Sequence, residues 1–285
     1  MKILTYYRDD VLRLALYTDE GLIDVSDALR KALTPDNFYQ SGLKTLEELR
    51  NIETATTKKM AIESLKLGPC VPNPGKIICV GLNYARHAKE SGMAAPTSPV
   101  LFSKFNNSIA ADQEIIPFSK EYTQLDYEAE LVVVIGREAH HIPAENALDY
   151  VLGYCNGNDL SERALQLNLP GGQWLIGKTC DKFLPIGPYV VSKDEAGDPQ
   201  NMSIKGWLNG KLRQNSDTSD MIFSVAEIIA YISRFMTLLP GDIISTGTPE
   251  GVILGMKEKV WMQAGDEFVI EIGNLGRLTN KVEMV

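Results

Sequence analysis

The sequence has a deficit of basic residues. Lys and Arg total 28 against 37 Asp and Glu, which gives a formal net charge of -9 over 285 residues. Charge of this sign repels nucleic-acid phosphates and anionic membrane surfaces, so we expect neither nucleic acid nor a membrane as a partner. A small anionic substrate would need local cations or a metal ion to attract it.

Paired cysteines and long apolar runs are also missing. Cys70, Cys79, Cys155 and Cys180 lie far apart and form no C-x-x-C pair, so we predict reduced thiols. No stretch approaches the roughly 18 apolar residues that a membrane span needs, and the N-terminus lacks a long apolar signal segment. These absences favour a cytoplasmic protein.

The chain divides into a small and a large predicted domain. Residues 1–70 begin with apolar runs that predict a β meander (MKILTYY, LRLALYT and GLIDVS), followed by a segment of helical character at 43–66. Gly68-Pro69 and the nearby PNPGK stretch predict a boundary. We therefore expect a β-rich N-terminal domain and a second domain at 71–285.

The second domain is predicted to be mainly β. Strand patterns occur in KIICV, PVLF, DIIST, KVWM and EFVIEI, and the run ELVVVIG is typical of a strand buried on both faces. Asn209-Gly210 predicts a type I′ hairpin turn within 204–214. Ser224 and Glu227 form a capping-box pattern that opens a helix, which we expect to end at Pro240-Gly241.

Two acidic residues enter the apolar strand ELVVVIG. Glu128 and Glu130 are two residues apart, so a strand directs both side chains to one face, where their repulsion calls for a cation or a proton. Asp159 follows a Gly-rich turn and would add a third carboxylate, a set that suits Mg²⁺ or Mn²⁺. The alternatives are a solvated strand end for the two glutamates and simple helix capping for Asp159.

A possible acid–base pair lies in GLNYARHAKE. Asn83 can cap a short helix that Gly92 ends, and His87 and Glu90 then share one face at i and i+3. A carboxylate beside an imidazole fixes its tautomer and raises its basicity, as a general base requires. The alternative is a surface pair. His140-His141 has no such setting and is interpreted as loop.

Further polar residues stand near glycine-rich segments. Lys178 could neutralise an enolate or a carboxylate, although a single lysine is often merely solvated. Arg163 and Gln166 lie three residues apart and could bind a carboxylate, unless they form an exposed helix surface. Thr246-Gly247-Thr248-Pro249 offers hydroxyl and backbone N–H groups at the end of a strand, which alone is a weak signal.

Taken in order, these segments resemble the fumarylacetoacetate hydrolase family from about Lys76 to the C-terminus. The resemblance rests on CVGLNYARHAKE, LDYEAELVVVIG, GYCNGNDLSER, WLIGKTCDKFLPIGP and the long segment from NGKLRQ to GTPEGV. It implies an α+β, mainly β fold: a mixed β-sandwich roll, usually homodimeric, after a small N-terminal domain. The sequence departs from the usual pattern at Ile253-Leu254 and Asn106-Asn107, which affects the expected shape of the substrate.

The resemblance also implies a set of functional residues. Mg²⁺ or Mn²⁺ would be bound at Glu128, Glu130 and Asp159. The segment carrying His87 and Glu90 would close over the substrate as a lid. The remaining expected site residues are catalytic Lys178 and, for substrate binding, Tyr84, Arg86, Arg163, Gln166 and Thr248.

The implied activity is hydrolysis of the C3–C4 bond of a 2,4-dioxo acid, an acylpyruvate or a 2,4-diketo-3-deoxy sugar acid, with release of pyruvate. We hypothesise that His87, oriented by Glu90, deprotonates the water that attacks C4, while Lys178 and the Thr248 region stabilise the oxyanion. The same site could decarboxylate oxaloacetate or isomerise a dienedioate. A metal-binding protein without turnover is a further alternative.

Overall fold

The computed structural model describes residues 1–55, 59–62, 65–90 and 92–284. The strands among these residues are β1 Lys2–Arg8, β2 Val11–Thr18, β3 Gly21–Asp24, β4 Leu67–Gly68, β5 Ile77–Gly81, β6 Val100–Ser103, β7 Ile109–Ala110, β8 Ile116–Phe118, β9 Leu125–Asp126, β10 Ala129–Ile135, β11 Val151–Asn158, β12 Ser161–Glu162, β13 Leu184–Ser192, β14 Ser203–Leu208, β15 Lys211–Asp217, β16 Ile243–Ser245, β17 Glu267–Ile272 and β18 Arg277–Met284.

The helices of the described residues are short. The α-helices are α1 Val25–Leu29, α2 Pro35–Ser41, α3 Leu43–Ala55, α4 Ala85–Glu90, α5 Arg163–Leu167, α6 Trp174–Lys178, α7 Lys193–Ala196 and α8 Val225–Ser233, and the 3-10 helices are η1 Asn106–Ser108, η2 Ala144–Tyr150, η3 Thr218–Asp220 and η4 Ile253–Gly255. None of these helices is long and apolar enough to cross a lipid bilayer.

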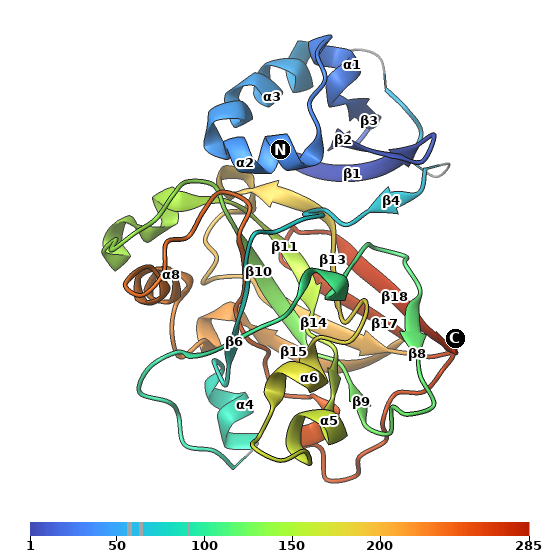
Figure 1. The fold of residues 1–285 in the computed structure, drawn as a ribbon, viewed down its shortest axis with the longest axis vertical. Helices are drawn as coiled ribbons and strands as arrows, with labels where there is room; N and C mark the ends of the chain where they lie inside the picture. The colour runs from blue at the N-terminus through green and yellow to red at the C-terminus, as the bar shows by residue number, and fades with distance from the viewer. Residues whose placement is uncertain (56–58, 63–64, 91, 285) are drawn as a thin grey trace.

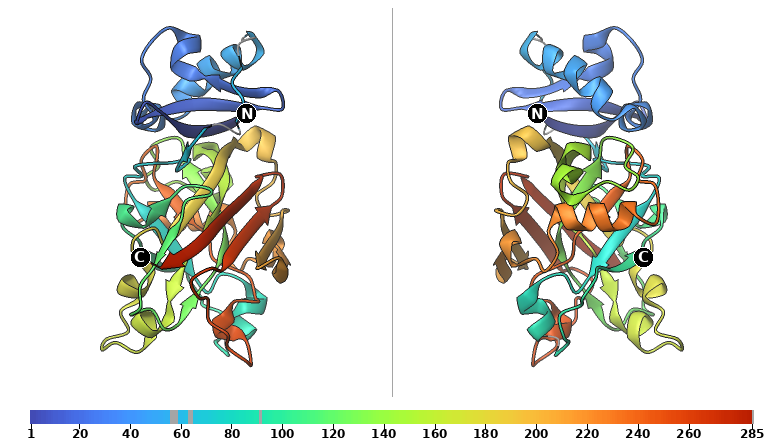
Figure 2. Two further views of the ribbon diagram at one scale, coloured as in Figure 1. Left: turned by 90° about the vertical axis from the view of Figure 1, so that its right-hand side faces the viewer. Right: turned by 90° about the vertical axis from the view of Figure 1, so that its left-hand side faces the viewer.

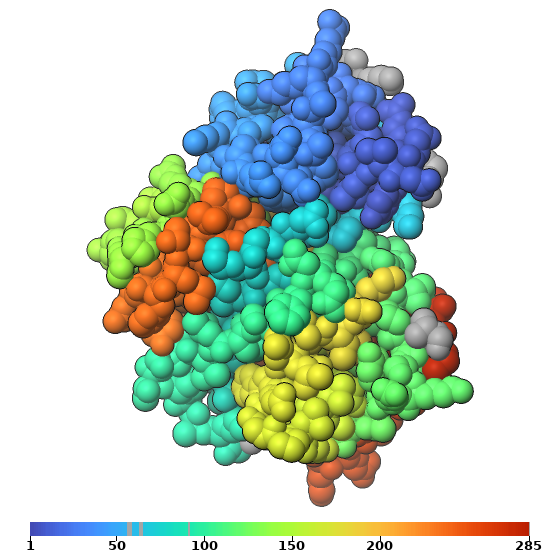
Figure 3. Space-filling view, viewed as in Figure 1, coloured from blue at the N-terminus to red at the C-terminus, as the bar shows by residue number. Residues whose placement is uncertain are grey.

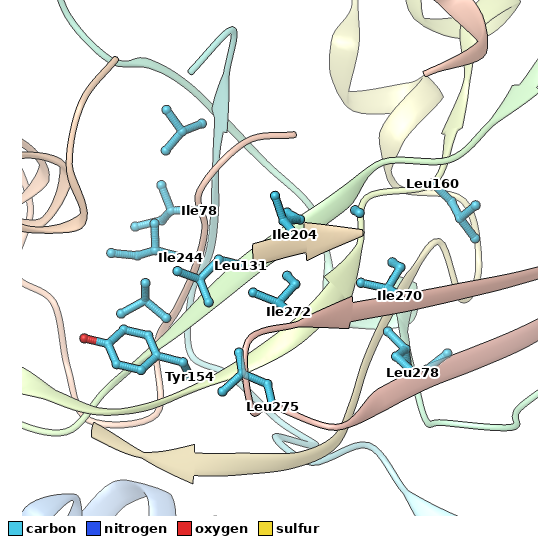
Figure 4. Close-up of a cluster of buried hydrophobic side chains, with 14 of the residues drawn as sticks. Ile78, Leu131, Tyr154, Leu160, Ile204, Ile244, Ile270, Ile272, Leu275 and Leu278 are labelled. Carbon is cyan, nitrogen blue, oxygen red and sulfur yellow. The ribbon is translucent and has the colours of Figure 1, made fainter. Parts of the chain in front are cut away.

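Two sheets form the framework (Figure 1). The larger has the strand order β3-β2-β1-β13-β11-β10-β16-β5-β6, and the smaller has the order β15-β14-β17-β18-β8. Apolar side chains from both sheets, such as Leu131, Tyr154, Ile204 and Ile270, belong to one buried cluster (Figure 4). Parallel and antiparallel pairs both occur, and α8 lies on the opposite side of the molecule from β17 and β18 (Figure 2). The predicted mainly β, mixed sandwich is confirmed.

The N-terminal strands extend the larger sheet. Strand β1 pairs with β13 through Lys2 opposite Val191, and Ile3 and Phe38 share a buried cluster with Val134. The first residues of the chain cover the upper end of the molecule (Figure 3). The meander of β1, β2 and β3 is confirmed, whereas the domain boundary at residue 70 stays a prediction.

Several local predictions from sequence are confirmed. Every residue of β10 is buried, as the run ELVVVIG indicates for a strand covered on both faces. Asn209 and Gly210 connect β14 to β15 with φ values of 51° and 72°, the two positive angles of a type I′ turn. Ser224 forms the predicted capping box with Glu227 at the start of α8.

Other predictions were wrong in extent. Helix α8 ends at Ser233, before the predicted end at Pro240-Gly241. Beyond the helix, Leu238 forms an isolated antiparallel bridge with Ala139, which requires an extended backbone there. The predicted strand KVWM contributes only an isolated bridge from Met262. The helical segment at 43–66 is helical only to Ala55 in α3; residues 56–58 and 63–64 lie outside the described residues. Helices α1 and α2 were not predicted.

Candidate metal and acid–base site

Three carboxylates meet where β10 begins and β11 ends. Glu128 directly precedes β10, Glu130 lies in it, and Asp159 directly follows β11. The antiparallel pairing of these strands brings one ligand oxygen from each residue within 4.8 Å of the others. Their exposed fractions are 6%, 2% and 0%. The alternative of a solvated strand end is therefore wrong for these residues.

Asp159 is not a helix cap. The residue that caps α5 is Glu162, whose side chain accepts a hydrogen bond from the backbone N–H of Leu165. The Asp159 carboxylate instead faces two lysines. This placement excludes the capping alternative and leaves Asp159 as part of the carboxylate cluster.

Buried cations surround the three carboxylates. Lys178 Nζ donates to Glu128 Oε2 at 2.7 Å and to Asp159 Oδ2 at 2.8 Å. Lys104 Nζ donates to Asp159 Oδ1 at 2.5 Å. Arg163 donates to Glu128 Oε1 at 2.6 Å. The predicted alternatives of a solvated Lys178 and an exposed Arg163 are wrong, because both side chains are buried and paired.

The cations act unequally on the carboxylates. Burial by itself would raise the pKa of Glu128, but the charges of Lys178 and Arg163 outweigh that effect and hold its pKa below the usual range. Burial raises the pKa of Glu130 well above its usual value, and the nearby charges of Asp159 and Glu128 add to the shift. Glu130 accepts hydrogen bonds from the Ser245 hydroxyl and from the Gly247 backbone N–H.

The donor set fits a divalent cation. Three clustered carboxylates, of which Glu128 and Glu130 line a cavity, provide the hard oxygen ligands that Mg²⁺ and Mn²⁺ prefer. Burial and the neighbouring charges of Asp159 and Glu128 both disfavour the ionised form of Glu130, and a bound cation would offset both effects. Glu128, Glu130 and Asp159 are thus the residues that would hold the metal.

The predicted His–Glu pair faces the same cavity. His87 and Glu90 lie on α4, with His87 Nδ1 3.6 Å from Glu90 Oε2, a separation longer than a hydrogen bond. His87 is 7% exposed, so the surface-pair alternative is wrong. Its Nδ1 is buried and has no hydrogen-bond partner among the described residues. Glu90 is held from the other side by the Gly251 backbone N–H.

Asn83 has a role other than the expected helix cap. Its side-chain amide donates to the carbonyl oxygens of Thr246 and Phe223, and its side-chain oxygen accepts from the Phe223 N–H. These bonds fasten the segment before α4 to the end of β16. Gly92 follows α4 with a φ of 67°, as expected for a glycine that ends a helix.

A cavity of about 430 Å³ contains most of the predicted residues. Those lining it are His87, Glu90, Glu128, Glu130, Arg163, Gln166, Lys178 and Thr248. Gln166 accepts from Arg163 Nη1 at 2.9 Å, and Thr248 accepts from Gln214. Tyr84 and Arg86 do not line this cavity: Tyr84 is fully buried, and the Arg86 side chain is paired with other residues. His140 and His141 are exposed in a loop, as predicted.

Sequence reasoning missed several residues of the site. Lys104 follows β6 and contacts Asp159, and Asp126 accepts from Arg163 and from the backbone N–H groups of Ile253 and Leu254. The available signals were a lysine at the end of an apolar strand and a third acid beside the Glu128 motif. Leu254, one of the unusual residues in the sequence, lines the cavity.

The fold and this site together define a β-rich protein in which a buried carboxylate centre and a His–Glu pair border one cavity. Residues 76–283 match the family described as fumarylacetoacetate (FAA) hydrolase C-terminal. The mitochondrial oxaloacetate tautomerase of Xenopus laevis is 40% identical over 245 residues, which cover 86% of this chain and 77% of that protein. The chain therefore belongs to the fumarylacetoacetate hydrolase family.

Solved structures agree with this assignment. The 5-carboxymethyl-2-hydroxymuconate delta-isomerase of Mycobacterium smegmatis has a TM-score of 0.79 at 30% identity, with 100% of both chains covered. Maleylpyruvate hydrolase from Sphingobium sp. SYK-6, in complex with manganese(II) and pyruvate, has a TM-score of 0.82 at 27% identity, covering 100% of this chain and 99% of that one. The family thus includes proteins named as a tautomerase, an isomerase and a hydrolase.

Proposed function

We propose that this protein catalyses proton transfer at carbon 3 of a small 2-oxo acid, with keto–enol tautomerisation of oxaloacetate as its first activity. The observation that carries the proposal is that His87 and Glu90 line one cavity together with Glu128 and Glu130, two members of the three-carboxylate cluster. The name of the Xenopus laevis relative, an oxaloacetate tautomerase, supports this choice of substrate.

A divalent cation, Mg²⁺ or Mn²⁺, held by Glu128, Glu130 and Asp159 would supply charge stabilisation for the carboxylate and 2-oxo oxygens of the acid. His87 Nδ1 faces Glu90, so Nε2 is the nitrogen left to exchange a proton with the substrate. Removal of the C3 proton turns the C–H electron pair into the C2–C3 double bond of an enolate. The imidazolium of His87 then gives its proton up to the 2-oxo oxygen, directly or through a water, which forms the enol and regenerates the neutral imidazole.

The chain's own residues control the charge around this reaction. Lys178 bridges Glu128 and Asp159, so its ammonium lies next to the place where the enolate develops negative charge. Glu90 places a carboxylate oxygen 3.6 Å from His87 Nδ1, on the side of the ring away from the nitrogen left for the substrate. Phe102, Trp174 and Leu254 supply apolar lining.

Hydrolysis of the C3–C4 bond of a 2,4-dioxo acid is a second candidate. Its support is the size of the cavity, because about 430 Å³ lies in the ~300–1,000 Å³ range of sites for drug-sized ligands and exceeds the needs of a four-carbon acid. In this reaction His87 would deprotonate a water that attacks C4. Oxaloacetate decarboxylation and dienedioate isomerisation share the enolate and are tested with it. A protein that only binds metal has no use for His87 and Glu90 at the cavity.

The experiment compares three readouts on the same preparation. Enol–keto exchange of oxaloacetate is followed by the loss of enol absorbance, pyruvate release is measured from acylpyruvates and 2,4-diketo-3-deoxy sugar acids, and CO₂ release is measured from oxaloacetate. Each is run with Mg²⁺ or Mn²⁺ and with EDTA. Acceleration of enol–keto exchange above a metal-only blank supports the proposal. Pyruvate release without that acceleration would replace it with the hydrolase.

Assembly and location remain further proposals. We propose a homodimer, supported by the exposed apolar residues Phe105 and Met236, which line a groove beside the edge strand β6. Light scattering on the eluted protein would test this state. The cytoplasmic location stays a prediction, and the name of the Xenopus laevis relative places that protein in mitochondria.

A further inference from the structure

Arg86 is the residue of α4 whose contacts differ most from the sequence hypothesis of substrate binding. His87 and Glu90 both line the cavity, whereas Arg86 does not. Successive residues of an α-helix are separated by about 100° around its axis, so the side chain before His87 leaves the helix in another direction. Arg86 therefore needs a different function from the one that sequence reasoning gave it.

The Arg86 guanidinium connects α4 to two other segments of the chain. Its Nη2 donates to Ser216 Oγ at 2.8 Å, and its Nε lies 3.4 Å from Asp220 Oδ1. Ser216 belongs to β15, the second strand of the hairpin in the smaller sheet, and Asp220 belongs to η3, which directly follows that strand. Its Nη1 lies 3.2 Å from Glu250 Oε1, two residues after Thr248 of the cavity.

The backbone of α4 uses the same anchor points. Arg86 N–H donates to Asp220 Oδ2 at 3.1 Å, so one carboxylate holds both the main chain and the side chain of this residue. At the other end of the helix, Glu90 accepts from the Gly251 N–H. Both ends of α4 are thus tied to residues 250–251, and His87 lies between the two ties.

We propose that Arg86 is a positioning residue: it fastens α4 to Asp220 and Glu250 and thereby holds His87 in the wall of the cavity that Glu128 and Glu130 also line. This inference rests on the proposed function for its kinetic consequence but not for its structural one. The Arg86 side chain is 53% exposed, so the fastening is an ion-pair network that salt weakens. The positioned group is His87, which is 7% exposed.

The kinetic test separates positioning from substrate binding. In Arg86→Gln we expect kcat for enol–keto exchange to fall about fivefold while KM stays within about twofold, the size of effect expected for a partly exposed ion-pair network. Arg86→Lys keeps one charge and should recover part of the loss. Arg277→Gln removes a comparably exposed arginine, paired with Glu271, and should leave both constants unchanged. A raised KM with unchanged kcat would assign Arg86 to the substrate instead.

Amide hydrogen exchange tests the fastening without any substrate. Arg86→Gln and Asp220→Asn should each speed exchange in residues 84–90, and the effect of the double variant should be smaller than the sum of the two single effects, because both changes break the Arg86–Asp220 pair. Exchange in β10 should stay unchanged. Unaltered exchange at 84–90 in both variants would overturn the proposal even if the wild type is active. Faster exchange in a protein that converts no 2-oxo acid would keep the positioning role and reject the proposed function.

Discussion

Lys104 Nζ lies 2.5 Å from Asp159 Oδ1, and both side chains have no exposed surface. The lysine comes from the end of β6 and the aspartate from the end of β11, 55 residues further along the chain. With Lys178 on its other oxygen, Asp159 is held by two buried ammonium groups. The stability of the buried Asp159 carboxylate therefore depends on both lysines.

Replacing Lys104 by Met should destabilise the fold strongly. The change leaves Asp159 with one counter-ion in a buried place, and breaking a buried pair typically costs about 3–5 kcal/mol. Denaturant unfolding measures the loss. Lys31→Met provides the control, because Lys31 and Glu48 form an exposed pair that we expect to contribute no more than about 1 kcal/mol. Equal losses in the two variants would mean that the buried pair has no special weight.

Divalent metal should stabilise the protein through the carboxylate cluster. Mn²⁺ at a concentration 100 times its Kd should add about 2.7 kcal/mol to the free energy of unfolding. In Glu130→Gln this gain should shrink, because a ligand charge is lost while the amide oxygen can still accept from Ser245 and Gly247. Glu258→Gln, an exposed change, should keep the full gain. Undiminished stabilisation of Glu130→Gln would place the metal elsewhere.

His87→Ala should separate the reactions that share this site. Water activation and proton abstraction need a base, so hydrolysis and tautomerisation should fall by roughly 10²- to 10⁴-fold. Decarboxylation of oxaloacetate needs only stabilisation of the enolate and should be spared. Added imidazole should recover part of the lost activity if the side chain acts as a base. Equal falls in decarboxylation and hydrolysis would show that this division of roles is wrong.

Lys259 should contribute to the recognition of a distal carboxylate. Its side chain is exposed to solvent and lines the cavity. In Lys259→Gln we expect KM to rise up to about fivefold for 2-oxo acids with a second carboxylate at the far end, and to stay constant for apolar tails. Lys257→Gln, which alters an exposed lysine away from the cavity lining, is the matched control. The same KM change for both kinds of tail would argue against charge recognition.

The parts of the site that depend on local patterns could be predicted from the sequence. The spacing of Glu128 and Glu130 in an apolar strand gives their shared direction, and helix geometry gives the pairing of His87 with Glu90. Lys104 could not be predicted, because its contact with Asp159 depends on how β5, β6, β10 and β11 are ordered in the sheet.

The partners of Arg86 could not be predicted from the sequence either. A helical pattern fixes the angle at which a side chain leaves the helix but not which segment it meets, and here the partners lie more than 120 residues away. Secondary structure shows the same difference between local and tertiary effects. The hairpin turn at Asn209 could be predicted from two residues, whereas the end of α8 at Ser233 depends on tertiary packing.

Asp112 should give the protein a pH dependence that one substitution removes. Burial raises the pKa of this carboxyl from 3.8 to about 6, although its Oδ1 accepts from the Thr279 N–H. Between those two pH values the folded state holds a proton that the unfolded state has released. The contribution of Asp112 to stability is therefore complete below pH 3.8 and is lost as the pH rises through about 6.

In Asp112→Asn this loss cannot occur, and the amide oxygen can still accept from Thr279. The stability of the variant relative to wild type should rise by about 1–2 kcal/mol between pH 4 and pH 7, less than the full shift implies because Asp112 is only partly buried. Urea unfolding of both proteins at several pH values measures the difference. Asp19→Asn, an exposed change, should show no such trend. A difference that is constant with pH would mean that Asp112 carries the same charge in the folded and unfolded chain.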